Sequence, residues 1–130
     1  MSDHPHAVVM RRALQAFQSG DMPVLEELFH PDMLWHVPGR SQVSGVHAGR
    51  PAFFAFLGKL MELSGGTFKV DNRSVLTDDA GGVFVDQVTA ERGGRRLDQS
   101  LLLRVRIEDG RIVEGFDHFY DTAAWDAFWA

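Results

Sequence analysis

The spacing of apolar residues changes about halfway along the chain, from a helical period to a strand period. In the first half, Val9, Ala13, Ala16 and Phe17 recur at three- and four-residue intervals, and Gly20 ends the run. This pattern predicts an N-terminal helix that turns one face toward a core.

Two more helices and one strand are expected before residue 67. Asp21 can cap a short helix over 23–29, a strand is expected over 33–37, and the segment that follows it is expected to be a loop. Pro51 opens a third helix with a broad apolar face, made by Phe53, Phe54, Leu57, Leu60 and Met61.

From Thr67 onward the pattern is that of strands. Runs of Val, Leu, Phe and Thr are separated by DDAGG, RGGR and EDGR, each of which suits a hairpin turn. Four consecutive antiparallel strands are expected, at about 67–77, 83–92, 95–107 and 111–120, with a short helix over 122–129. Helices segregated from an antiparallel meander indicate an α+β fold.

The strand expected at 97–107 has two different faces, because side chains alternate across a strand. One face is mostly apolar and is predicted to be interior: Leu97, Gln99, Leu101, Leu103, Val105 and Ile107. The other carries Asp98, Ser100, Arg104 and Arg106, and is expected to meet solvent or another subunit.

Composition and charge narrow the class of protein. The 130 residues are 45% hydrophobic and 24% charged, which is typical of one globular domain, so a single domain over 1–130 is expected. The absence of cysteine excludes disulfides and thiolate chemistry and suits a cytoplasmic protein. A net charge of -5 argues against a nucleic-acid partner, and the N-terminal residues lack the apolar run of a signal peptide or membrane span.

The stretch EGFDHFYD, residues 114–121, places an acid and a histidine side by side among aromatic residues. In a regular strand, Asp117 shares a face with Gly115 and Phe119, whereas His118 lies on the opposite face. The adjacent pair therefore cannot serve one site unless a bulge intervenes.

Three segments resemble a known family: LFHPDMLWHVPG, SGVHAGRPAFFAFL and EDGRIVEGFDHFYD. Together with the order of elements, they resemble SnoaL-like proteins, in the superfamily of ketosteroid isomerase and nuclear transport factor two. The resemblance covers nearly the whole chain. It implies a strongly curved, mainly antiparallel sheet, wrapped by three N-terminal helices into a cone with an internal apolar pocket and closed by a short C-terminal helix. It also implies a homodimer formed through the sheet.

The resemblance assigns roles to particular positions. His36 matches the general-base aspartate of ketosteroid isomerases, while Ala13 and Leu103 stand where those enzymes have their oxyanion donors, so ketosteroid isomerisation itself is not expected. In SnoaL-type cyclases the last strand often carries His-Trp-Asp, whose aspartate is the acid/base. Gly115, Phe116 and Asp117 match that motif and keep the aspartate.

His36 and Asp117 are the candidate catalytic dyad, with His36 abstracting a proton and Asp117 orienting the imidazole or returning the proton. Two alternatives remain open: an idle, partly exposed histidine, and a structural aspartate paired with a residue such as Arg104. Of Asp86 and Gln87, one can face the pocket. The predicted ligand-binding residues are Trp35, His47, Phe17, Phe53, Leu57, Leu103 and Phe119, and the predicted dimer face is Phe116, His118 and Tyr120.

These residues favour a small enzyme that works without a cofactor. Its histidines are too widely spaced in sequence to predict a metal site. We expect acid/base proton transfer of the isomerase, cyclase or dehydratase type, on a hydrophobic small molecule that carries a carbonyl group. The alternative is a non-catalytic, dimeric small-molecule-binding or adaptor domain of the same fold.

Overall fold

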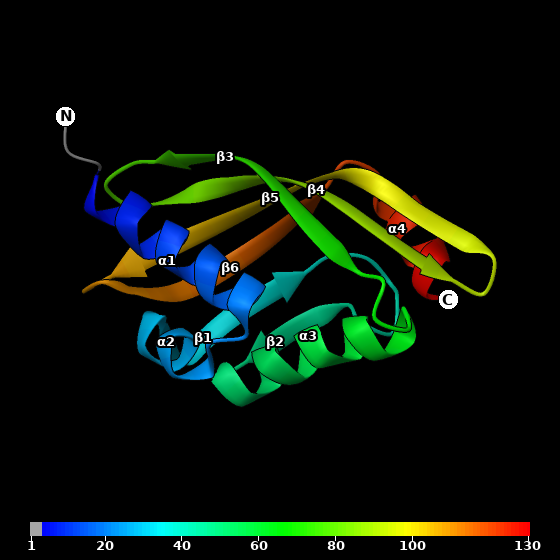
Figure 1. Ribbon diagram of the computed structural model, residues 1–130, viewed down its shortest axis with the longest axis horizontal. Helices are drawn as coiled ribbons and strands as arrows, with labels where there is room; N and C mark the ends of the chain where they lie inside the picture. Colours follow the sequence, from blue (N-terminus) through cyan, green and yellow to red (C-terminus); the bar gives the residue numbers. More distant parts are fainter. Residues whose placement is uncertain (1–3) are drawn as a thin grey trace.

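The protein is built around one six-stranded sheet with helices packed on one of its faces (Figure 1). The structure, a computed structural model, describes residues 4–130. Its strand order is β2-β1-β6-β5-β4-β3. The helices are α1 (Pro5–Ser19), α2 (Met22–Leu28), α3 (Arg50–Leu63) and α4 (Thr122–Trp129), and the strands are β1 (Phe29–Val37), β2 (Gly45–Ala48), β3 (Lys69–Thr77), β4 (Gly81–Arg92), β5 (Arg95–Glu108) and β6 (Arg111–Phe119).

Neighbouring strands are antiparallel except for β1 and β6, which run parallel. The meander predicted after residue 67 is confirmed, with element ends that differ by only a few residues. The short strand β2 was wrongly expected to be a loop. Its four residues pair with β1 through the backbone, with Trp35 opposite His47, and so small an edge strand carries no clear hydrophobic alternation of its own.

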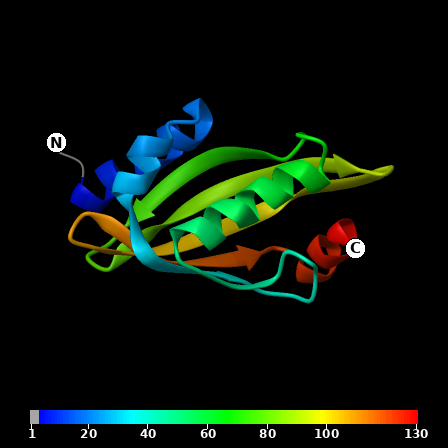
Figure 2. The same cartoon turned by 90° about the horizontal axis from the view of Figure 1, so that it is seen from below.

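The two faces of the sheet differ sharply in burial. Helix α1 packs against β3 and β4, and α3 packs against β1 and β2, so both helices cover the same, concave face (Figure 2). Small side chains let α1 lie close to the sheet, since Ala7, Ala13 and Ala16 are all buried there. On β5 the predicted alternation is confirmed: the apolar series from Leu97 to Ile107 faces inward, and only Leu103 in that series is not fully buried. The convex face remains open to solvent.

Helix α4 closes one end of the molecule, opposite the end where α1 begins (Figure 1). The inner side of α4 carries three buried aromatic residues, Trp125, Phe128 and Trp129. Arg92 and Arg95 donate hydrogen bonds to the carbonyl oxygen of Ala130, at 2.6 and 2.7 Å, which ties the helix to the β4–β5 hairpin. No helix among residues 4–130 is both long enough and apolar enough to cross a membrane.

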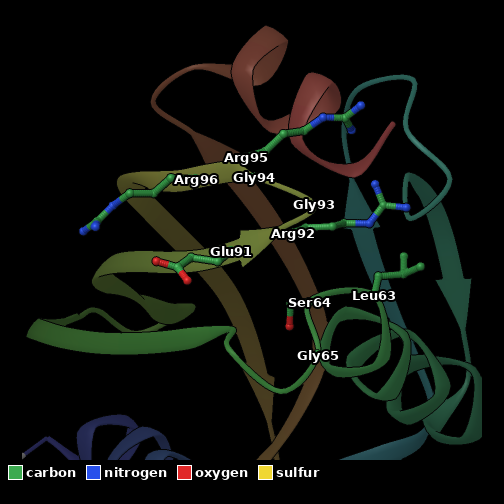
Figure 3. Close-up of a pocket in the computed structure, with 9 residues that line it drawn as sticks. All are labelled: Leu63, Ser64, Gly65, Glu91, Arg92, Gly93, Gly94, Arg95 and Arg96. Carbon is green, nitrogen blue, oxygen red and sulfur yellow. The ribbon is translucent and has the colours of Figure 1, made fainter.

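A surface hollow of about 510 Å³ lies at this end, between the β4–β5 hairpin and the end of α3 (Figure 3). Arg92 and Arg95 extend toward one side of it, and Glu91 and Arg96 toward the other. A second hollow, of about 640 Å³, lies at the opposite end of the sheet and is lined by residues such as Leu34, Arg106 and Glu114. Neither hollow is lined by a residue predicted to bind the ligand, so the internal apolar pocket remains a prediction.

Candidate functional site

Asp117 and Trp35 form a buried hydrogen-bonded pair on the concave face. They come from β6 and β1, which are adjacent and parallel, with Trp35 opposite Gly115. The indole Nε1 of Trp35 donates to Oδ1 of Asp117 over 3.0 Å. Trp35 is only 4% exposed and Asp117 only 6%. The hydrogen bond is therefore shielded from water, which makes it stronger than the same bond in solvent.

Gly115 makes this arrangement possible. A Cβ atom at this position would overlap Cζ3 and Cε3 of the Trp35 ring. The indole therefore lies across the backbone of β6, and its Nε1 reaches the next inward-facing residue, Asp117. From the other side, Phe53 of α3 packs against the Trp35 ring at a centroid distance of 4.6 Å. The absence of a side chain at Gly115 thus makes room for the tryptophan ring.

The carboxyl group of Asp117 is a weak acid in this environment. Burial raises its pKa from 3.8 to about 8, because removal from water penalises the charged form. The hydrogen bond from Trp35 opposes this rise, and the negative charge of Asp86 adds to it. At neutral pH the group is therefore mostly a neutral carboxylic acid, which can donate a proton.

Asp86 is a second buried acid on the same face. It lies on β4 between the buried residues Phe84 and Val88, and it is 1% exposed. Nδ2 of Asn72, on β3, donates to its Oδ1 over 2.8 Å, whereas its Oδ2 has no hydrogen-bond partner within residues 4–130. Burial raises the pKa of Asp86, and the Asn72 hydrogen bond limits that rise. Of the two residues left open by the sequence, Asp86 faces inward, while Gln87 bonds to Asp98 and Ser100 on the convex side.

His36 does not meet Asp117, so the predicted dyad is not formed. His36 follows Trp35 on β1 and therefore faces the convex side, where its Nε2 donates to Oε2 of Glu114 over 2.7 Å. Its ring stacks on Phe116 at 4.5 Å. The hydrogen bond from His36 is the main reason that the pKa of Glu114 is lowered. The register that places Trp35 inward forces its neighbour outward.

The predicted aromatic and aliphatic ligand-binding residues divide into two groups. Phe53 is fully buried, and Phe17 contacts it edge-on at 6.4 Å from the exposed side of α1. Leu57, Leu103 and Phe119 pack against the core but keep part of their surface accessible, and Leu103 is paired directly with Asp117 in the β5–β6 ladder. These three side chains therefore keep some apolar surface accessible, and Leu103 does so beside Asp117.

His47 lies apart from this group. Its Nε2 donates to the carbonyl oxygen of Val43 over 3.0 Å, and its ring stacks on Phe56 at 4.5 Å. Both contacts hold it at the β2 edge of the sheet, which makes it a structural histidine in this conformation.

The residues predicted for the dimer face do lie on the convex side, as the alternation in 114–120 predicts. Phe116 is half-buried under the guanidinium of Arg104, which lies 4.0 Å from the ring centroid. His118 is exposed, and Tyr120 is 83% exposed. Arg104 thus pairs with an aromatic ring on the convex side, which is the face opposite Asp117.

The sequence did not predict three polar contacts: Trp35 with Asp117, Asp86 with Asn72, and Glu114 with His36. The alternation of Phe84, Asp86 and Val88 was the available signal for Asp86, because an acid between two core residues of a strand is unusual. No signal in the sequence linked Glu114 to His36, since that contact depends on the parallel pairing of β1 with β6. Within residues 4–130, no cluster of three or more metal-ligating side chains occurs.

Comparison with known proteins agrees with this fold. A solved structure of Bal32a, from a soil-derived mobile gene cassette, is 45% identical, with a TM-score of 0.91 over 97% of each chain. A Xanthomonas campestris protein of unknown function with a cystatin-like fold is 32% identical, with a TM-score of 0.88 over 96% of this chain and 98% of the other. An uncharacterised protein of Mycobacterium tuberculosis is 34% identical over the full length of both chains. The model of the SnoaL-like domain matches residues 10–115, and the chain belongs to the SnoaL-like family.

Proposed function

We propose that this protein catalyses acid/base proton transfer on a hydrophobic small molecule that carries a carbonyl group, with Asp117 as the catalytic residue. One observation carries the proposal: a carboxyl group on the concave face is buried, neutral near pH 7, and bonded to Trp35. A neutral carboxylic acid of this kind can protonate a carbonyl oxygen.

One carboxyl group can complete a keto–enol conversion by acting twice. Asp117 first gives its proton to the carbonyl oxygen and becomes a carboxylate, which Trp35 Nε1 stabilises. The carboxylate then takes a proton from the carbon next to the carbonyl, which leaves the enol and restores the neutral acid. Isomerisation, cyclisation and dehydration can each begin from such an enol. Apolar surface on Leu57, Leu103 and Phe119 would hold the carbon skeleton.

The proposed function can be tested by deuterium exchange, because enolisation replaces the hydrogens next to the carbonyl. A series of cyclic ketones that includes 2-tetralone is incubated with the protein in D₂O, and proton NMR measures exchange relative to buffer. The wild type should accelerate exchange, and Asp117→Asn should lower the acceleration about 100-fold or more. His36→Ala, on the opposite face, should keep it.

Two results would contradict the proposal. If exchange ran at the buffer rate with every ketone, the proposed enzymatic function would be wrong. If a ketone bound without exchange, the result would favour the non-catalytic binding domain. Equal acceleration by the wild type and Asp117→Asn would show that the carboxyl group of Asp117 does not transfer the proton.

We also propose that two copies associate through the convex face of the sheet. The helices leave this face uncovered, and it exposes the apolar residue Leu102 (40%) beside His118 and near Tyr120. Exposed apolar surface of this kind on a sheet suits contact with a second sheet.

A further inference from the structure

The acid that the proposed mechanism leaves unused is Asp86. We propose that Asp86, held by Asn72, is a ligand-binding residue of the same concave site, and that its Oδ2 accepts a hydrogen bond from a hydroxyl or N–H group of the ligand. This inference rests on the proposed function, since it concerns the molecule that Asp117 protonates. It adds that the ligand has a donor at the end remote from its carbonyl group.

The position of Asp86 follows from the register of the sheet. Asp86 pairs with Leu101, and Asp117 pairs with Leu103, so the two acids flank β5 from its two neighbouring strands and point to the same face. Two strand spacings and an offset of two residues place their Cα atoms roughly 12 Å apart. The curvature of the sheet turns both side chains inward, and a fused two-ring molecule has about the length needed to meet both.

The hydrogen bonds of Asp86 are incomplete in a way that indicates a ligand. Oδ1 is held by Asn72, so the plane of the carboxyl group is set. Oδ2 is buried and has no partner among the described residues. A carboxylate has acceptor sites on both oxygens, and a buried acceptor without a donor is costly. A donor that enters the site with the ligand would remove that cost.

A purely structural role explains Asp86 poorly. Structural buried acids are normally paired with a cation or bonded by several backbone N–H groups. Among residues 4–130, the side-chain amide of Asn72 is the only hydrogen-bond partner of the Asp86 carboxyl group. Burial raises its pKa, and its charge raises the pKa of Asp117 in turn, so the folded chain carries an electrostatic cost at both positions.

The test compares three ligands that differ only at the remote end: 2-tetralone, 6-methoxy-2-tetralone and 6-hydroxy-2-tetralone. The last alone carries the donor. Calorimetric titration of the wild type should show that the hydroxy ketone binds about tenfold to 100-fold more tightly than the other two, as a hydrogen bond to a charged acceptor provides. Asp86→Asn should reduce this preference below about threefold, because the asparagine at this position would present an amide N–H in place of the Oδ2 atom of the carboxylate.

Two matched variants separate this inference from the proposed function. Asp117→Asn should weaken all three ketones alike and keep the preference for the hydroxyl group. Asp98→Asn changes an acid on the convex face, where Gln87 bonds to it, and should change nothing in this assay. A preference that survives in Asp86→Asn would overturn the inference while leaving the proposed function intact.

Failure of every ketone to bind would count against the proposed ligand class. A second measurement, which needs no ligand, then tests the role of Asp86. The melting temperature of ligand-free Asp86→Asn is compared with that of the wild type. A ligand-binding carboxylate with an unpaired oxygen should be a liability, so the variant should melt at least roughly 3 °C higher. A lower melting temperature would show that Asp86 stabilises the fold, and the inference would be overturned.

Discussion

Asp117→Asn should make the folding stability of the protein less dependent on pH, and the sign of the change follows from the pKa of Asp117. In the folded chain the pKa of Asp117 is raised to about 8, whereas its ordinary value is 3.8. Between those values the folded state holds a proton that the unfolded state has lost. The contribution to stability is therefore complete below about pH 3.8, and it is lost as the pH rises toward 8. Asparagine keeps the shape and the oxygen that accepts from Trp35, but it has no proton to lose.

The expected size follows from the proton linkage. One proton corresponds to about 1.4 kcal/mol of unfolding free energy per pH unit. Between pH 5 and pH 7.5 the wild type should therefore lose about 3 kcal/mol relative to Asp117→Asn. Urea unfolding at half-unit pH steps measures this difference, and all other titrating groups cancel because both proteins contain them.

The control is Asp32→Asn, which changes an exposed acid on β1. Its stability should run parallel to that of the wild type across the same pH range. A difference between Asp117→Asn and the wild type that stays flat from pH 5 to pH 7.5 would refute the reasoning, because it would show that Asp117 is already ionised in the folded protein at pH 5.

Three further predictions concern the neighbours of Asp117 and the convex face. Gly115→Ala should destabilise the protein by about 1–3 kcal/mol in urea unfolding, because its Cβ would overlap the Trp35 ring, whereas Gly58→Ala, in open space on α3, should be neutral or stabilising; equal effects would contradict this. Trp35→Phe should raise the pKa of Asp117 further, since it removes the hydrogen bond that lowers it, and an unchanged pH profile of stability would count against the bond. Leu102→Asp should shift the proposed dimer to monomer in analytical ultracentrifugation, while Met61→Glu, exposed on α3, should not; a wild type that sediments as a monomer would remove the proposal.

The alternation of polar and apolar residues predicted the fold well because it records burial directly. On β6 it separated Asp117 from His118 correctly, and on β5 it identified the inward face. The strand β2 was not predicted, because a four-residue edge strand is held by backbone pairing with β1. Such pairing places few requirements on the side chains.

The candidate site was predicted only in part, and the failure has one cause. Asp117 was placed inward from the alternation on β6, but His36 was placed from its match to a family position, without the same test on β1. Trp35 and His36 were both assigned to the pocket, although the period of two places neighbouring residues of a strand on opposite faces. Asp86 could be seen as an acid in a core strand, yet its free oxygen depends on how Asn72 approaches from β3, across a register shift that no local pattern encodes.

Within residues 4–130, charged side chains are paired with opposite charges on the convex face of the sheet but not on the concave face. This difference supports the proposal that the concave face is functional. On the convex side, Glu114 is bonded to both His36 and Arg106, and Arg106 also pairs with Glu108. On the concave side, Asp117 and Asp86 accept hydrogen bonds only from Trp35 and Asn72 within the described chain, and the charge of Asp86 raises the pKa of Asp117. Two apolar residues in their place would give a more stable core, since uncompensated buried acids are costly. This contrast supports the proposal that the concave face uses the chemistry of those acids, at some expense of stability.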